Sequence, residues 1–230
     1  KKIGYNLFPF LIKTNEFGIP QKRHRCILIG SKSTEPINQD MFHSILNSFK
    51  TTPPPMRNFM EKTIGNVHLK LDTTDEFNIP TDKWVILDQI STNTQTEQIA
   101  DTSQITPNVV KKCCNLEKCY KSKALSFAKR SSPIHSEIVD IDAPSKTLIC
   151  TYDRMPRLFV PVKVNNCDGT TERYLRPYTI NELKQIQGFP IDFQLCGTPS
   201  AKVVQVGNAV PPNIATVLIK TYRKYVSTIS

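Results

Sequence analysis

Apolar residues follow a strand-like pattern near the N-terminus. Residues 4–12 and 25–30 are rich in bulky apolar side chains, and residues 15–20 between them include Gly18 and Pro20, which mark a loop. The second run is almost entirely apolar after its first residue, which is typical of a strand covered on both faces. We therefore predict two strands joined by a loop, in an α/β sheet.

Helical periodicity is visible in three segments. Residues 41–49 place apolar side chains on one stripe, and the three prolines at 53–55 stop that helix. Residues 180–187 begin with a capping box, in which Thr179 and Glu182 cap each other's backbone, and they end at Gly188. The last helix is predicted over residues 214–226, with a core-facing stripe of Ile214, Val217, Leu218, Thr221, Tyr222 and Tyr225.

Strand patterns are sparse between the first and second helices. After residue 55 the periodicity is lost for about fifty residues, and only residues 83–87 resemble a strand. Residues 146–152 and 158–164 are strand-like and are separated by a turn-rich segment. We predict that they form a hairpin in a β-rich second domain, followed by a turn at residues 166–169.

A polar junction precedes the last helix. The sequence Val-Gln-Val-Gly-Asn-Ala-Val-Pro-Pro lies at residues 204–212. It is predicted to be a strand or tight loop in which Gly207 allows the chain to turn into the helix. The unpaired N–H groups at such a junction suit a small anionic or carboxylate ligand. Asn208 could equally be an ordinary helix cap.

Composition adds a possible partner and a compartment. The formal net charge is +10, and seven basic residues against one acid lie within residues 111–130. Such a run suits the phosphate backbone of DNA, although a solvated loop is an equally good interpretation of the run alone. No membrane-spanning run or signal peptide is visible, and the seven Cys lack disulfide spacing, which favours an intracellular protein. Cys113, Cys114 and Cys119 lack a second pair of ligands, so no metal is predicted.

Three stretches together resemble the DNA cytosine-5 methyltransferases, and they occur in the order of that family. The first is Gly-Ile-Pro-Gln-Lys-Arg-His-Arg at residues 18–25. The second runs from Arg173 through the capped helix to Gln-Gly-Phe-Pro at residues 187–190. The third is Gln-Val-Gly-Asn-Ala-Val-Pro-Pro at residues 205–212. Each stretch alone could arise by chance, but three in order make a specific match.

The resemblance implies a fold and a set of roles. The fold would be α/β: the C-terminal part of a Rossmann-like methyltransferase domain plus a smaller, β-rich target-recognition domain. A target cytosine must be flipped out of the duplex before it can be methylated. Arg23 and Arg25 would lie at the flipped base and its phosphate, and Gln21 would support their loop. Alternatively, Arg23 and Arg25 could be ordinary surface charges at the start of a strand, with no role at the base or its phosphate.

The same resemblance assigns cofactor and DNA contacts. S-adenosyl-L-methionine would lie against Asn208, Ala209 and Val210, and double-stranded DNA would contact the recognition domain. Residues 1–35 would end the catalytic domain, residues 36–200 would form the recognition domain, and residues 201–230 would return to the catalytic domain. The predicted DNA-binding residues are Lys121, Lys123, Lys129, Arg130 and Arg173.

The family's first-half motifs have no counterpart in this sequence. No Cys follows a Pro, no Glu-Asn pair occurs, and the eight Gly form no Gly-x-Gly loop. The nucleophile, the supporting glutamate and the cofactor loop would therefore come from a polypeptide carrying the N-terminal half. We expect this chain to be inactive alone and to be a split subunit or a fragment. The alternative is a non-catalytic, sequence-specific DNA-binding module derived from such an enzyme.

Overall fold

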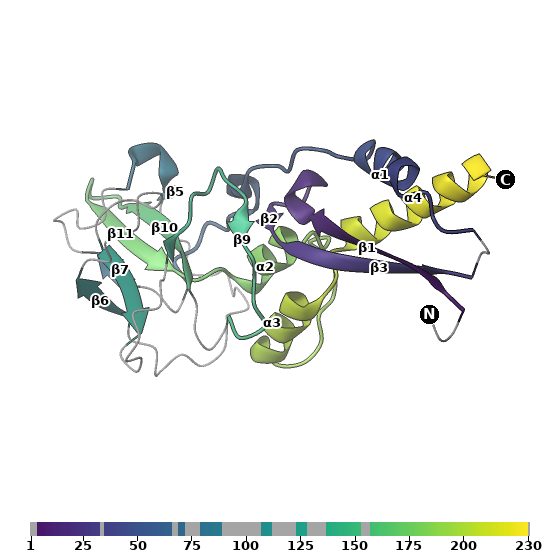
Figure 1. Ribbon diagram of the computed structural model, residues 1–230. Coiled ribbons are helices and arrows are strands. Elements are labelled where there is room, and N and C mark those ends of the chain that lie inside the picture. The colour runs from purple at the N-terminus through teal and green to yellow at the C-terminus, as the bar shows by residue number, and fades with distance from the viewer. Residues whose placement is uncertain are drawn as a thin grey trace.

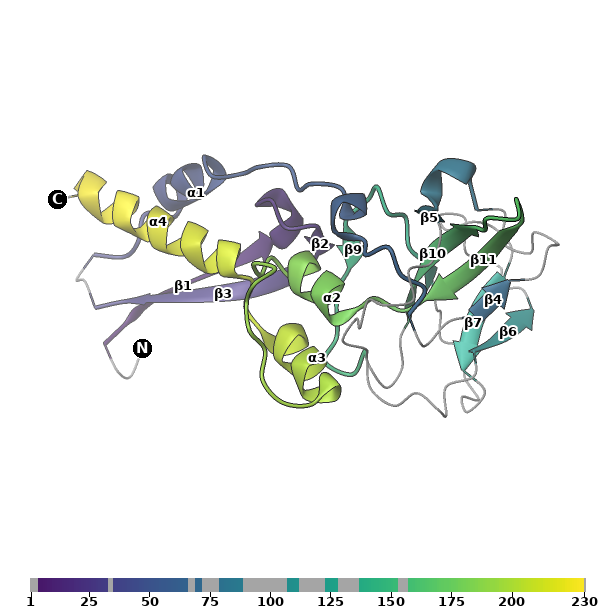
Figure 2. The same ribbon diagram turned by 180° about the vertical axis from the view of Figure 1, so that it is seen from behind.

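The computed structural model describes residues 4–32, 35–65, 69–71, 79–88, 107–111, 123–127, 137–152 and 157–229. The molecule is elongated, with a hairpin and two helices at one end, a mixed sheet at the other, and two short helices between them (Figures 1 and 2). Separate hydrophobic cores fill the two ends.

The first end is built on an antiparallel hairpin. Strands β1 (Asn6–Lys13) and β3 (His24–Ser31) pair over their whole length, and the 3-10 helix η1 (Thr14–Glu16) begins their connection. The prediction of two strands joined by a loop is confirmed. Alternate residues of β1 are buried in an apolar cluster, namely Phe8, Phe10 and Ile12.

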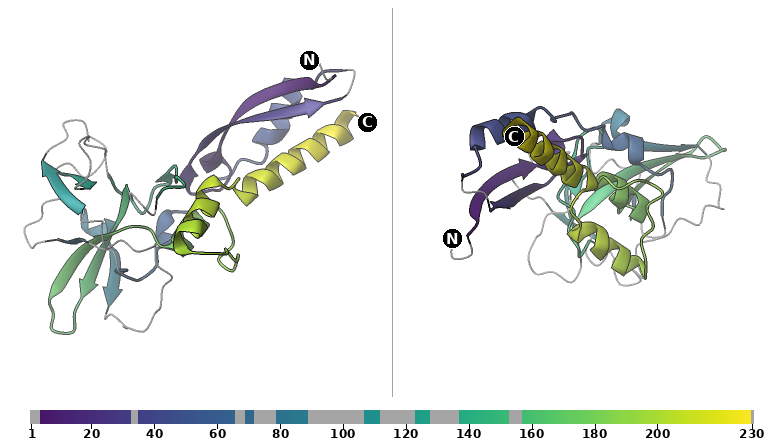
Figure 3. Two further views of the ribbon diagram at one scale, coloured as in Figure 1. Left: turned by 90° about the horizontal axis from the view of Figure 1, so that it is seen from below. Right: turned by 90° about the vertical axis from the view of Figure 1, so that its right-hand side faces the viewer.

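Two helices cover one face of this hairpin. Helix α1 (Gln39–Asn47) is capped by Asn38, whose side chain accepts a hydrogen bond from the Met41 N–H at 3.1 Å, and α4 (Pro212–Ile229) lies beside it (Figure 3, left). The Tyr225 hydroxyl of α4 accepts a hydrogen bond from the Asn38 N–H at 2.9 Å, which ties the two helices together. Both helices were predicted, but Tyr222 is 49% exposed and does not belong to the buried stripe of α4.

The prediction that the second strand is covered on both faces is wrong for this chain. Leu28 is 60% exposed and Cys26 is exposed, because α1 and α4 lie on the opposite face of the hairpin. Within the described residues, β3 pairs with β1 alone. Ile27 and Ile29 pack against the core of this end, whereas the other face of β3, which carries Leu28, is left uncovered by the described residues.

The other end is a mixed sheet. Its strands are ordered β4 (Leu69–Leu71), β11 (Thr171–Arg176), β10 (Leu158–Asn165) and β5 (Val85–Asp88), and β8 (Glu137–Ile138) also pairs with β10. The 3-10 helices η2 (Met56–Phe59) and η3 (Thr81–Lys83) precede β4 and β5, respectively. Strands β6 (Pro107–Lys111) and β7 (Lys123–Phe127) pair antiparallel as a separate two-stranded sheet. The β-rich character predicted for the middle of the chain is present.

The predicted hairpin between residues 146–152 and 158–164 is wrong. Strand β10 pairs antiparallel with β11 through the turn at residues 166–169, where Gly169 has φ +80°. Only Ser145–Lys146 form a strand on the other side (β9), and it pairs in parallel with β2 (Gln21–Lys22). Strand β10 is paired with β11, β5 and β8 instead, and residues 147–152 pack as a loop.

Two helices lie between the ends. Helix α2 (Ile180–Ile186) has the predicted capping box, and α3 spans Pro199–Asn208. The prediction of a strand or loop before Gly207 is wrong, because Thr198 caps a helix with Pro199 in its first turn, and Val203 and Val206 are buried three residues apart. The helix breaks after Asn208, and α4 begins at Pro212.

The packing does not follow the predicted domain limits. Helix α1, expected in the recognition domain, shares its core with β1 and α4, whereas α3 packs its valines with the mixed sheet. In the first turn of α2, both carboxylate oxygens of Glu182 accept hydrogen bonds from the Arg176 guanidinium, at 2.6 and 2.7 Å. Both side chains are almost fully buried. Glu182 therefore has the structural role that its capping-box position indicated.

Candidate functional site

The three motif segments meet between the two ends of the molecule, where β2, α2 and α3 lie (Figure 1). Gln21 is fully buried, and its amide nitrogen donates to the side-chain oxygen of Gln187 at 2.6 Å. The Gln187 amide nitrogen in turn donates to the Ala209 carbonyl at 2.8 Å. One residue from each motif segment thus forms a continuous hydrogen-bonded relay.

Arg23 adds a second connection at the same place. Its guanidinium donates to the Leu148 carbonyl at 3.2 Å and to the Gly207 carbonyl at 3.1 Å, and the residue is 6% exposed. Burial, with a smaller contribution from the charge of Arg25, lowers the pKa of Arg23, but an arginine stays protonated in proteins. The buried cation therefore holds two carbonyls from distant segments.

Gly207 brings α3 against the loop that Arg23 binds. A Cβ atom at this position would lie 2.7 Å from both the Cα and the N atom of Cys150, and 2.9 Å from the carbonyl carbon of Ile149. These distances are shorter than real Cβ contacts, and the atoms are backbone atoms. A glycine is required here because the helix and the loop approach too closely for a side chain.

Other predicted site residues are exposed beside this buried junction. Arg25 is exposed, and its guanidinium donates to the neighbouring His24 carbonyl at 2.7 Å. Asn208 is exposed at the end of α3, and Val210 is 63% exposed in the link to α4. The buried junction holds Gln21, Arg23 and Ala209, and leaves Arg25, Asn208 and Val210 open to ligands.

The predicted DNA-binding residues are only partly within the described structure. Arg173 lies on β11, half-buried, with its guanidinium over the ring of Trp84 at 5.8 Å. Lys123 begins β7, and its side chain is not described. The remaining residues of that prediction lie outside the described residues, as do the cysteines of the zinc question, namely Lys121, Lys129, Arg130, Cys113, Cys114 and Cys119.

The sequence reasoning missed two parts of the junction. Gln187 was treated only as part of the tetrapeptide, yet its side chain is the central member of the relay. The sequence pattern predicts a strand at residues 148–150, but they form a loop. The Leu148 carbonyl in this loop accepts a hydrogen bond from Arg23, and the backbone of Ile149 and Cys150 lies against Gly207. A long polar side chain at the end of a capped helix was the available signal for Gln187, whereas nothing in the sequence marks the loop.

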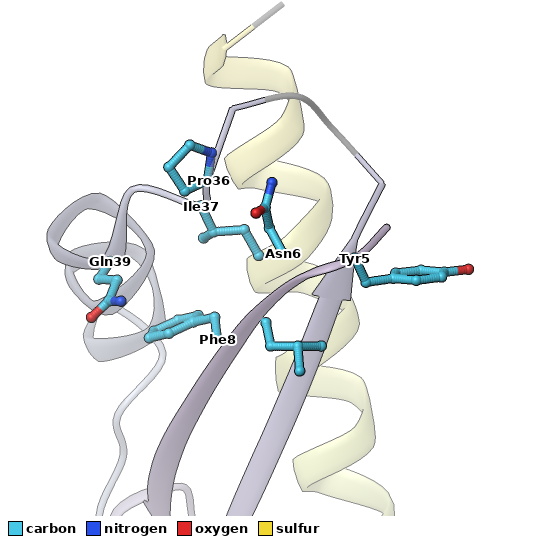
Figure 4. Close-up of a pocket in the computed structure, with 7 residues that line it drawn as sticks. Tyr5, Asn6, Phe8, Pro36, Ile37 and Gln39 are labelled. Atoms are coloured by element: carbon cyan, nitrogen blue, oxygen red, sulfur yellow. The ribbon is translucent and has the colours of Figure 1, made fainter. Parts of the chain in front are cut away.

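A small pocket lies away from this junction. It has a volume of about 200 Å³ and lies between β1 and the segment leading into α1, lined by residues that include Asn6, Phe8, Ile37 and Gln39 (Figure 4). It is at the Ser31 end of the hairpin, opposite the end that carries Arg25. We therefore do not assign it to the candidate site.

Two other kinds of site are absent from the described residues. In the part of the chain that the structure describes, no group of three or more His, Cys, Asp or Glu side chains could hold a metal ion. No helix among those same residues is both long and apolar enough to cross a membrane.

Residues 1–224 match the family model for C-5 cytosine-specific DNA methylases. The match covers nearly the whole chain, and the chain belongs to this family. The family is one of S-adenosylmethionine-dependent enzymes, so the class expected from the three motif segments is confirmed.

Curated relatives are bacterial. The chain is 24% identical to the Type II methyltransferase M.BbvI of Brevibacillus brevis over 97% of its own length and 50% of the relative. It is 31% identical to M.HgiDI of Herpetosiphon aurantiacus over 39% of the chain and 28% of the relative. It is 36% identical to M.HindV of Haemophilus influenzae over 34% and 25%. The chain spans half or less of the curated relatives it matches.

Solved structures include the Dnmt2 methyltransferase of S. pombe, with a TM-score of 0.48 and 12% identity over 98% of this chain and 60% of that one. A putative DNA modification methyltransferase encoded within an E. coli prophage has a TM-score of 0.48 and 14% identity, over 98% of this chain and 62% of that one.

Proposed function

We propose that this chain supplies the DNA-recognition half of a cytosine-5 DNA methyltransferase and completes the active site together with a polypeptide carrying the first half. The observation that carries this proposal is the buried junction of Gln21, Gln187 and Arg23. It ties the three motif segments of the family into one structure, although Gln21 and Gln187 are 166 residues apart along the chain and Arg23 and Gly207 are 184 apart.

The two arginines have different roles in this proposal. The exposed Arg25 contacts the flipped cytosine or its phosphate, where a guanidinium provides several fixed donors. Arg23 is a positioning residue, because its guanidinium already binds two carbonyls of this chain. This differs from the prediction from sequence, which gave both arginines the same role.

S-adenosyl-L-methionine would supply the methyl group, and the residues around α3 and α4 suit one wall of its site. Asn208 is exposed at the end of α3 and Val210 is exposed in the link to α4, and the Gly207 and Ala209 carbonyls beside them accept hydrogen bonds from Arg23 and Gln187. Val210 offers an apolar surface and Asn208 an amide, which suits a ligand that is partly apolar and partly charged. The catalytic thiolate, the supporting glutamate and the Gly-rich loop belong to the other half.

The role of Arg25 is tested with the assembled enzyme. We expect Arg25→Ala to lower turnover by at least about tenfold while duplex affinity changes less, because the side chain acts only after the base is flipped. Lys22→Ala is the control, since Lys22 is an exposed base three residues earlier. Equal losses of turnover and affinity would show that Arg25 is a plain phosphate contact.

The basic run is proposed as the duplex-binding surface. Changing Lys121, Lys123, Lys129 and Arg130 together to Ala should weaken DNA binding. The fall of log affinity with log salt should also become less steep, by about one unit of slope per lost phosphate contact. An unchanged slope would show that these residues face solvent. DNA binding without methyl transfer in any assembled form would favour the non-catalytic DNA-binding module.

A further inference from the structure

Strands β2 and β9 form a parallel ribbon between the two ends of the molecule (Figures 1 and 2). Their register places Gln21 beside Ser145 and Lys22 beside Lys146. Next to this pairing, the Thr147 hydroxyl donates to the Lys22 carbonyl at 2.8 Å. Backbone segments 125 residues apart along the chain are thereby held side by side.

The two faces of this ribbon differ. Successive side chains of a strand point to opposite faces. Gln21 and Ser145 are buried on the inner face, where the Ser145 hydroxyl accepts a hydrogen bond from the Tyr178 hydroxyl at 3.3 Å. Lys22 and Lys146 are both exposed on the outer face. The inner face therefore anchors the ribbon, and the outer face presents two neighbouring ammonium groups.

These two lysines carry like charges at adjacent positions. Neighbouring strands are about 4.8 Å apart, and like charges at paired positions destabilise a sheet. Lys146 forms an ion pair with Glu137 of β8, whereas no carboxylate among the described residues pairs with Lys22. Exposed side chains gain little from packing that would offset this repulsion. An anionic partner from outside the chain would remove it.

Glu137 is held more firmly than the lysine with which it pairs. Its N–H donates to the Arg157 carbonyl at 2.7 Å, and β8 pairs in parallel with β10. The Lys146 side chain is 64% exposed, whereas that of Glu137 is 17% exposed. Exposed ion pairs contribute little to stability, so the lysine can leave this carboxylate for another anion at small cost. Glu137 therefore competes with any anion that Lys146 binds.

A phosphate of the DNA backbone is the anion that this position favours. Arg25, which is proposed to contact the flipped nucleotide, follows Lys22 by three residues and is exposed as well. An ammonium group is a compact charge with three donors, which binds phosphate oxygens without reading a base. A free phosphate ion would stay largely hydrated between two exposed lysines, whereas DNA is held here through its other contacts with the chain.

We infer that Lys22 and Lys146 bind the DNA backbone beside the flipped nucleotide, and that Glu137 limits this binding by neutralising Lys146. The inference rests on the proposed function and adds a phosphate contact from β9 to it. When DNA binds, Lys146 exchanges its carboxylate partner for a phosphate. The net charge of +10 attracts any duplex, and a competing carboxylate at this contact weakens that sequence-independent attraction.

The test measures the binding of the full chain to a fluorescently labelled duplex of mixed sequence over a range of salt concentrations. The variants are Lys22→Ala, Lys146→Ala, Glu137→Gln, and Glu137→Gln combined with Lys146→Ala. Far-UV circular dichroism establishes that each variant folds.

A second ion pair on the mixed sheet provides the matched control. Lys70 of β4 pairs with Glu172 of β11, and their side chains are 59% and 29% exposed, close to the values for Lys146 and Glu137. The control variants are Lys70→Ala and Glu172→Gln. They remove one charge each, as the test variants do, but away from the ribbon.

We expect opposite effects from the lysines and the carboxylate. Lys22→Ala should make the fall of log affinity with log salt less steep by about one unit. Lys146→Ala alone should lower affinity less than Lys22→Ala does, because Glu137 already neutralises that lysine. Glu137→Gln should tighten binding by about threefold or more, since Lys146 then becomes a full phosphate contact. That gain should disappear when Lys146→Ala is added, and Glu172→Gln should tighten binding less.

Chemical acetylation followed by mass spectrometry gives a direct readout of contact. Bound duplex should protect Lys22 and Lys146 from the reagent, while the exposed Lys220 of α4 should stay reactive. Protection of Lys220 to the same extent would show that the duplex has no preference for the ribbon.

Three binding results would also overturn the inference. The salt slope is unchanged in Lys22→Ala; Glu137→Gln and Glu172→Gln tighten binding equally; or the gain from Glu137→Gln persists without Lys146. The second result would mean that removing any acid from this basic chain has the same effect.

Methyl transfer by the assembled enzyme separates this inference from the proposed function. As plain phosphate contacts, Lys22 and Lys146 should lower affinity and turnover together when they are replaced, in contrast with Arg25→Ala. Binding that responds as expected, in a chain that methylates DNA with no partner, leaves the inference standing and refutes the proposed function. Methyl transfer by an enzyme whose DNA affinity is insensitive to Lys22→Ala and Glu137→Gln does the reverse.

Discussion

Replacing Gly207 by Ala tests the close contact on which the candidate site depends. The new Cβ would lie 2.7 Å from two backbone atoms of Cys150, so α3 or the loop must move by about 0.7 Å to reach an ordinary 3.4 Å contact. Overpacking of this kind costs about 1–3 kcal/mol, and rigid backbone neighbours favour the upper end. Losing the hydrogen bond from the Arg23 guanidinium adds about 1.5–3 kcal/mol.

The helix itself opposes this loss, because Ala is favoured over Gly in a helix by about 1 kcal/mol. We therefore expect Gly207→Ala to lower the free energy of unfolding by about 2–4 kcal/mol. The assay is urea denaturation followed by the fluorescence of Trp84, the single tryptophan, which is buried next to the mixed sheet. Val204→Ala on the exposed side of α3 is the control. A Gly207→Ala chain as stable as the control would refute the close contact.

Two further perturbations probe the junction and the acid response. Gln187→Ala removes the centre of the relay and leaves the buried amide of Gln21 and the Ala209 carbonyl without their partners, so urea unfolding should show a loss of about 2–4 kcal/mol. Asp142 accepts two hydrogen bonds from Arg57, and this partner, followed by Lys83, holds the pKa of its carboxyl below the ordinary value. The contribution of Asp142 to stability is therefore present above the ordinary carboxyl pKa and is lost as the pH falls below it, and Asp142→Asn should flatten that acid loss.

Each of these two predictions has its own control. Gln185→Ala removes a neighbouring amide on α2 that makes only a 3.4 Å hydrogen bond, and it should change stability much less than Gln187→Ala does. An equal effect of the two substitutions would argue against the relay. For the acid response, stability is measured at several pH values between 5 and 2. A constant difference between Asp142→Asn and the wild type over that range would contradict the assigned pKa shift.

Local signals predicted the regular elements well. Thr179 and Glu182 are spaced as a capping box and form one, and the apolar periods at residues 41–49 and 214–226 correspond to helices. Each of these elements is determined by residues close in sequence. The strands at residues 6–13 and 24–31 were found for the same reason, since two runs of bulky apolar residues are separated by a loop that contains Gly18 and Pro20.

The errors come from interactions that a local pattern does not contain. Residues 146–152 have strand propensity, but β11 is the antiparallel partner of β10 and leaves them as a loop. Residues 204–206 are β-branched or polar and suggested a strand, yet Thr198 and Pro199 start a helix that contains them. Tertiary pairing and capping outweigh weak propensities.

The site was predictable to the extent that it lies in motifs. The resemblance selected Gln21, Arg23 and Ala209, and the structure brings them together, although it turns Arg23 inward to bind carbonyls. Which of two nearby arginines is buried depends on the loop at residues 148–150, which approaches from more than a hundred residues away. No pattern around Arg23 records that contact.

The central claim is that this chain is half of a methyltransferase site. It is tested most directly by mixing the chain with the first half of M.BbvI, duplex DNA and S-adenosyl-L-methionine labelled in its methyl group. We predict label on carbon 5 of cytosine only when both polypeptides are present, and none with either alone. A mixture that forms a complex and binds DNA but transfers no label would contradict the claim.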